Sequence, residues 1–188
     1  MFKTLSLVLF LCLSTISQAF SDDTLYTDLQ EVSVTVNTGA SEGSGVIVTR
    51  KIVTGPNKTE TINFVWTAGH VVDNLRSVRT VIGPDGSSRK IIEFKDAEIT
   101  KELTENGRKV GQLTMSAKVI KYSDAEDGED LALLLIRKRN FIQIGATFYK
   151  SDDPVLIGTE LYHIGSLLGQ GGHNSMTRGI ISQVGRVL

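Results

Sequence analysis

Two short segments of the chain carry residues that can do acid–base chemistry. His70 follows an apolar run and the small pair Ala68 and Gly69, which lets the backbone turn tightly and hold the imidazole ring in place. A general base needs such a fixed position, because proton transfer requires the heavy atoms to approach to roughly 3 Å. A structural histidine at the end of a strand is the alternative interpretation.

Asp130 is the candidate partner of that histidine. It stands at the head of a strongly apolar run at 131–136, where a rigid strand would hold a partly buried carboxylate beside an imidazole. Asp124 and Asp127 lie in a polar turn nearby and compete less well. An aspartate before a strand is often only a turn residue, so Asp130 acquires a chemical role only together with His70.

A metal site is a second possible use of the histidines. His70, His163 and His173 are separated by 93 and 10 residues, and these spacings match no short zinc-binding motif. No acidic residues are arranged around them as further ligands. We therefore expect neither a metal nor another cofactor.

The elements that must position these residues are predicted to be short β-strands. Val32, Val34 and Val36 alternate with polar residues, which indicates a strand with one buried face. Turn-prone residues separate these runs, and no helical period persists, so we expect an all-β barrel or sandwich. The predicted strands are 31–36, 46–48, 62–67, 78–82, 90–94, 115–120, 131–136, 160–164 and 180–184. Segments 51–61 and 96–111 are interpreted as polar insertions, the second as a long hairpin or loop.

The N-terminus predicts export. Lys3 precedes an apolar stretch at 5–13, and small residues at 17–19 fit a secretory signal cleaved after Ala19. Cys12 lies inside this segment, so we expect a mature chain without cysteine, in the periplasm or secreted. The formal net charge of −1 calls for neither nucleic acid nor a membrane surface, and we expect no membrane anchor in the mature chain.

Several motifs, taken in order along the chain, resemble the trypsin-like serine proteases of the chymotrypsin fold, and most closely their bacterial Deg/HtrA-like branch. They are Gly-Ser-Gly at 43–45, Thr-Ala-Gly-His at 67–70, Asp-Leu-Ala-Leu-Leu at 130–134, Gly-Ser-Leu-Leu-Gly at 165–169 and Gly-Ile-Ile-Ser at 179–182. Leu167 stands where such enzymes often have proline.

The resemblance implies a serine endopeptidase that acts on polypeptides. His70 would be the general base, and Asp130 would hold its ring in the correct tautomer. It also implies a double β-barrel, with a first barrel at 20–150 and the beginning of a second at 151–188.

The nucleophile of that family is absent from the sequence. No Gly-x-Ser-Gly-Gly segment occurs, and Ser44, Ser166 and Ser175 do not occupy a nucleophile turn. We therefore expect a C-terminally incomplete protease domain, with the serine and the oxyanion hole beyond Leu188. The alternatives are a catalytically inactive homologue that acts as a secreted binding module, and an unrelated secreted β-barrel.

Overall fold

The computed structural model describes residues 23–106, 108–126, 128–166 and 173–185 of the chain. The predicted signal segment at 1–19, Asp127 and most of the Gly-Ser-Leu-Leu-Gly motif lie outside these residues. The described elements, in chain order, are α1 (Asp23–Val32), β1 (Ser33–Asn37), β2 (Glu42–Gly55), β3 (Lys58–Ala68), α2 (Gly69–Val72), the 3₁₀ turn η1 (Asp73–Leu75), β4 (Arg76–Ile82), β5 (Ser88–Phe94), β6 (Ala97–Glu105), β7 (Arg108–Tyr122), β8 (Leu131–Ile136), β9 (Glu160–Gly165) and β10 (Ser175–Ile180).

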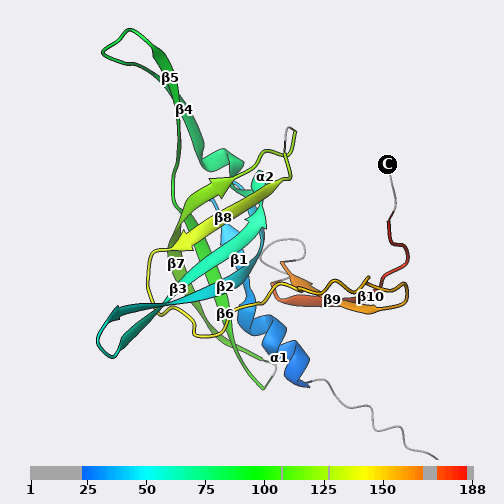
Figure 1. Cartoon of the computed structure of the whole chain (residues 1–188). Coiled ribbons are helices and arrows are strands. Elements are labelled where there is room, and N and C mark those ends of the chain that lie inside the picture. Colours follow the sequence, from blue (N-terminus) through cyan, green and yellow to red (C-terminus); the bar gives the residue numbers. More distant parts are fainter. Residues whose placement is uncertain (1–22, 107, 127, 167–172, 186–188) are drawn as a thin grey trace, which may run out of the picture.

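A closed antiparallel barrel forms the centre of the molecule, with the strand order β1-β2-β3-β8-β7-β6 (Figure 1). Each strand directs alternate side chains inward, as its period-two pattern requires. Ile47, Val65 and Leu134, from three neighbouring strands, are completely buried in this core. The prediction of an all-β chain built on a barrel is confirmed.

The hairpin of β6 and β7 corrects one sequence-based interpretation. Segment 96–111 was expected to be an insertion, yet β6 pairs with both β1 and β7 and forms part of the barrel wall. Ala97 and Ile99 of β6 and Ala117 and Val119 of β7 are buried in the core, whereas the half of the hairpin nearest its turn is mostly exposed. Because segment 96–111 is rich in polar residues, its composition does not indicate that β6 is a barrel strand.

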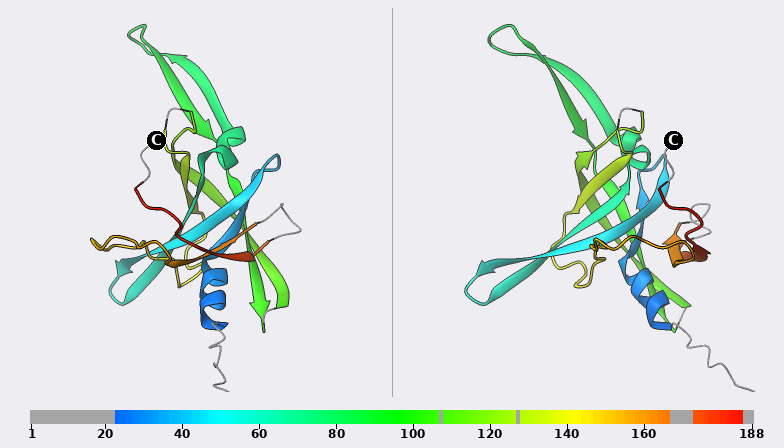
Figure 2. Two further views of the ribbon diagram at one scale, coloured as in Figure 1. Left: turned by 90° about the vertical axis from the view of Figure 1, so that its right-hand side faces the viewer. Right: turned by 45° about the vertical axis from the view of Figure 1, so that its right-hand side comes forward.

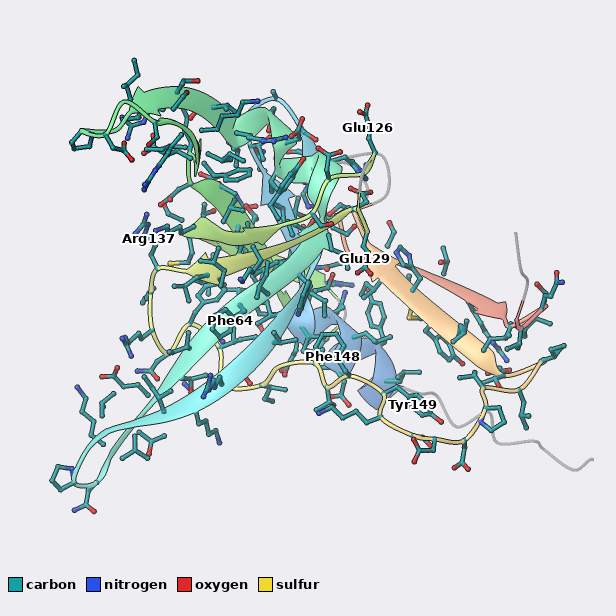
Figure 3. All side chains as sticks on the ribbon, turned by 45° about the horizontal axis from the view of Figure 1, so that its top comes forward. Phe64, Glu126, Glu129, Arg137, Phe148 and Tyr149 are labelled. Atoms are coloured by element: carbon teal, nitrogen blue, oxygen red, sulfur yellow. The ribbon has the colours of Figure 1, made fainter. Side chains whose placement is uncertain are left out.

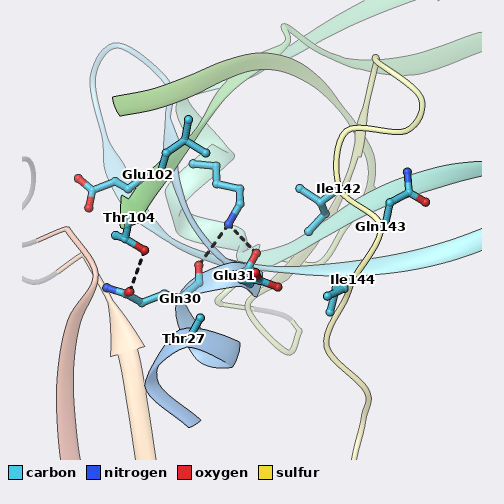
Figure 4. A pocket seen from close by; sticks show the side chains of 10 residues that line it. Thr27, Gln30, Glu31, Glu102, Thr104, Ile142, Gln143 and Ile144 are labelled. Carbon is cyan, nitrogen blue, oxygen red and sulfur yellow. Dashed lines mark hydrogen bonds between the residues drawn. The ribbon is translucent and has the colours of Figure 1, made fainter. Parts of the chain in front are cut away.

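Helix α1 is a second departure from the sequence-based expectation. The sequence predicts a strand from residue 31, but residues 31 and 32 end a helix that lies against one end of the barrel (Figures 1 and 4). The buried Lys101 of β6 donates hydrogen bonds from Nζ to the carbonyl oxygens of Glu31 (2.7 Å) and Gln30 (3.4 Å). Burial lowers the pKa of Lys101. A cation at the C-terminal carbonyls of a helix also complements the helix dipole.

Two hairpins project from the barrel on different sides (Figures 1 and 2). Strands β2 and β3 continue through the polar segment 51–61 as one extended hairpin. Strands β4 and β5 form a separate two-stranded sheet, and β9 and β10 form another. The strand expected at 180–184 is wrong in position, because β10 ends at Ile180.

The segment after β8 is held to the barrel by a buried side chain. Asn63 is completely buried, and its amide group donates to the carbonyl of Ile142 (2.9 Å) and accepts from the N–H of Phe141 (3.1 Å). A buried polar group requires such partners, because leaving it unpaired costs about 1–3 kcal/mol. In the described part of the chain, no helix has the length and apolar character needed to span a membrane.

Candidate active site

The single turn of helix α2 fixes the direction of His70. Val71 and Val72 are buried in the barrel core. Since successive residues of a helix point in different directions, their burial turns His70 outward, and 67% of its side chain is exposed. Gly43 makes room for this packing, because a Cβ on it would lie 2.5 Å from Val71 Cγ2.

The pairing of β3 with β8 brings His70 and Asp130 together. Their last paired residues are Ala68 and Leu131, so the two candidates lie just beyond the same end of one strand pair. Asp130 has a positive φ of 51°, a conformation that costs energy for residues other than glycine and that often marks functional positions. The sequence-predicted pair is therefore adjacent in space.

Three hydrogen bonds join these two residues and their neighbour. Asp130 Oδ2 lies 2.7 Å from His70 Nδ1, and its Oδ1 accepts the backbone N–H of His70 at 2.8 Å. The N–H of Gly69 donates to the backbone carbonyl of Asp130 at 3.0 Å. Asp130 is 34% exposed, and the bonds from the ring and the backbone of His70 lower its pKa. The carboxylate thus remains ionised beside the ring.

This geometry determines which ring nitrogen is the base. A carboxylate at Nδ1 favours the tautomer that carries its proton on Nδ1, which leaves the lone pair of Nε2 available. Among the described residues, the hydrogen-bond partner of the His70 ring is Asp130 alone. His70 can therefore accept a proton at Nε2, and Asp130 stabilises the imidazolium that forms.

Gly69 allows the chain to approach the site closely. A Cβ on Gly69 would lie 2.4 Å from the carbonyl oxygen of Ser123 and 3.1 Å from Asp130 Oδ1. Only glycine fits without displacing the loop at 123–130 that carries the carboxylate. Glu126 and Glu129 of this loop are exposed (Figure 3).

A polar cluster next to the pair was not found from the sequence. Arg76 forms ion pairs with Asp124 (3.4 Å) and Asp73 (3.8 Å), and its guanidinium lies over the ring of Tyr122. The Tyr122 hydroxyl donates to Asp73 at 2.7 Å, and burial together with this carboxylate raises the pKa of Tyr122 to about 12. The cluster joins β4 and β7 to the loop at 123–130, because the carbonyl of Asp124 accepts the N–H of Asp130 (3.3 Å). Asp124, which the sequence offers as an alternative to Asp130 as the partner of His70, is therefore paired with Arg76.

Two of the three candidate serines, Ser44 and Ser166, make contacts away from His70. Ser44 Oγ accepts the N–H of Ser166 at 2.8 Å. Buried Thr35 is hydrogen-bonded through its hydroxyl to both Ser166 Oγ and His173 Nδ1. These bonds hold the ends of the β9–β10 connection against β1.

The other two histidines lie on different elements from His70. His163 is exposed on β9, and His173 precedes β10. Across the described residues, no group of three His, Cys, Asp or Glu side chains is arranged to hold a metal ion. No protein-family model matches the chain, and no curated protein matches it.

Proposed function

We propose that this chain carries the general base and the orienting aspartate of a trypsin-like serine endopeptidase. The observation that carries the proposal is the His70–Asp130 pair, whose Nδ1–Oδ2 distance is 2.7 Å. This arrangement supports the roles that the chain motifs imply, since Asp130 holds the ring through Nδ1 and leaves Nε2 of the exposed side chain available as a base. A six-stranded antiparallel barrel that presents the pair at one end is consistent with the first barrel of such an enzyme.

The reaction would proceed by acyl transfer. Nε2 of His70 takes the proton of a serine hydroxyl while the serine oxygen bonds to the peptide carbonyl carbon, giving a tetrahedral intermediate. The His70 imidazolium then gives that proton to the leaving amine as the C–N bond breaks. Water, activated in the same way, cleaves the acyl-enzyme ester and regenerates the serine. Asp130 remains ionised throughout and stabilises the imidazolium.

The proposal assigns two residues of the catalytic group, and no serine of this sequence is assigned as nucleophile. Ser44 Oγ accepts a hydrogen bond from the N–H of Ser166, and Ser166 Oγ is hydrogen-bonded to the hydroxyl of Thr35. The hydroxyl required is one that reaches Nε2 of His70. In the same proposal the β9–β10 sheet belongs to a second barrel, and the chain acts on polypeptides outside the cytoplasm.

A second candidate function follows from the lack of a Gly-x-Ser-Gly-Gly segment among the 188 residues. In that candidate the barrel is a secreted binding module that resembles a protease without performing catalysis. The His70–Asp130 geometry favours the enzyme, because binding alone does not require a carboxylate at Nδ1 and an open Nε2.

A serine-directed fluorophosphonate probe distinguishes the two functions. We expect the protein, expressed from its complete gene, to be labelled, because the proposed enzyme requires a serine hydroxyl that reaches Nε2 of His70. Changing His70→Ala should lower the labelling rate by about a thousandfold, as expected for loss of a catalytic base. His163→Ala is the matched control, because His163 is exposed on β9 and is not part of the pair. Labelling that survives His70→Ala refutes the base assignment. If neither labelling nor peptide hydrolysis occurs, the enzyme is excluded and the binding module stands.

A further inference from the structure

The projecting hairpin of β4 and β5 is here called the arm. Only the three residues of η1 separate it from helix α2, which carries His70. It extends away from the barrel in every view (Figures 1 and 2). Its base is anchored on Tyr122, which contacts the ring of Phe94 (centroids 5.1 Å apart) and the guanidinium of Arg76. The arm is therefore a fixed extension of the candidate site.

The arm exposes apolar surface and unpaired strand edges. Val78, Ile82 and Ile92 are exposed by 53%, 74% and 51%. Within the described residues β4 and β5 pair only with each other, so each has an open outer edge. A two-stranded ribbon is at best marginally stable in water, and a third strand would pair one edge and cover apolar side chains.

The charges of the arm distinguish its two edges. On β4, Arg76 is paired with Asp73 and Asp124, and Arg79 is paired with Glu93 across the ribbon at 2.9 Å. Arg89 and Lys90 of β5, and Lys95 just after it, have no acidic partner among the described residues. The edge formed by β5 therefore carries uncompensated positive charge in a chain whose formal net charge is −1.

Two hollows lie along the same strand. The hollow near the tip measures about 470 Å³ and its lining includes Val81, Ile91, Arg89 and Asp85. The Asp85 carboxylate accepts hydrogen bonds from the N–H and the hydroxyl of Ser87. The hollow at the base measures about 480 Å³ and includes Lys95, Lys118 and Glu93, whose carboxylate is paired with Arg79. Each hollow combines apolar and charged side chains. Arg89 at one end of β5 and Lys95 just past the other are about 20 Å apart at the rise of an extended strand.

We propose that the outer edge of β5 binds an extended acidic polypeptide segment by strand addition. Backbone hydrogen bonds would supply the pairing, and carboxylate side chains would meet Arg89 at one end and Lys95 with Lys118 at the other. A membrane surface fits less well, because apolar and basic residues occupy both faces of the ribbon. A second copy of the arm fits less well, because two positively charged edges repel. The proposal goes beyond the peptidase assignment and requires no catalytic step.

Fluorescence anisotropy with a labelled peptide of about nine alternating Glu and Val residues tests the proposal, since that length spans the strand. A Lys-Val peptide of equal length is the probe control. The test variant is Arg89→Glu with Lys90→Glu. Its matched control is Arg50→Glu with Lys51→Glu on the other projecting hairpin, where both side chains are also exposed.

We expect the Glu-Val peptide to bind and the Lys-Val peptide not to bind. The arm variant should lose about tenfold or more in affinity, which corresponds to about 1.4 kcal/mol, and the control variant should retain its affinity. Amide resonances of β5 should shift when the Glu-Val peptide is added. Equal binding of both peptides, an equal loss in both variants, or shifts confined to other strands would overturn the proposal. Binding of phosphatidylglycerol vesicles or arm-dependent self-association without peptide binding would also overturn it. None of these outcomes depends on fluorophosphonate labelling. The peptide-binding proposal can therefore be refuted while the peptidase proposal stands, and the reverse is also true.

Discussion

The replacement Gly69→Ala tests the link between close packing and the candidate active site. The added Cβ would lie 2.4 Å from the Ser123 carbonyl oxygen, whereas ordinary contact begins at 3.4 Å. The obstacle is backbone, so the loop at 123–130 must move by about 1 Å, the difference between these two distances. Such overpacking costs about 2 kcal/mol. For a chain of this size, that cost lowers Tm by about 6 °C.

The same movement acts on the pair itself. Asp130 belongs to the displaced loop, and its Oδ2 lies 2.7 Å from His70 Nδ1. A displacement of about 1 Å away from the ring would take this contact beyond hydrogen-bonding distance. Differential scanning calorimetry measures the change in Tm, and proton NMR follows the Nδ1–H resonance of His70. We expect a lower Tm and a weakened or lost Nδ1–H signal.

The matched control is Gly179→Ala in β10, where a Cβ would meet nothing within 4 Å. It should leave both measurements unchanged. The reasoning is refuted if Gly69→Ala unfolds at the wild-type temperature and retains the Nδ1–H resonance, because the loop would then accommodate a methyl group without loss.

Three further outcomes follow from the contacts described above. Asp130 has a lowered pKa in the folded protein, so its contribution to stability is present above its unfolded pKa of about 3.9 and is lost as the pH falls through the folded value. The stability difference between wild type and Asp130→Asn, measured by urea unfolding, should therefore shrink in acid, and a constant difference would contradict the link to His70. Asn63→Ala removes the side-chain partner of three backbone groups of segment 141–142. It should lower the free energy of unfolding by about 3 kcal/mol in urea titrations. A loss below about 1 kcal/mol would mean that these groups find other partners. Thr35→Val removes the hydroxyl that holds β9 against β1. Amide hydrogen exchange in β9 should therefore accelerate about tenfold, while the amides of the barrel keep their exchange rates. Equal acceleration in all strands would mean that the substitution lowers global stability and does not act on β9 alone.

The local pattern of the sequence was sufficient to predict the core strands. Val34 and Val36 follow a period of two, and 131–136 is a continuous apolar run of strand length; both segments form barrel strands. The local pattern failed where a strand leaves the core. In β7 buried and exposed positions alternate only where the strand faces the barrel, and β6 is rich in charged residues throughout. The sequence therefore suggests an insertion at 96–111, a segment that holds all of β6 and the start of β7. Helix α1 was missed because Leu25, Leu29 and Val32 form only a short helical period beside a clear strand pattern.

The sequence by itself determined the residues available for chemistry: a histidine after two small residues, and an aspartate at the head of an apolar run. The tertiary structure alone decided that the two residues touch. Their contact depends on the pairing of β3 with β8, two strands separated by more than sixty residues of chain in which β4 to β7 are formed. It depends as well on Gly69, which admits the loop of Asp130 at a distance that no other residue allows. Local periodicity selects a strand and its buried face, whereas register between distant strands is set by the packing of the whole barrel.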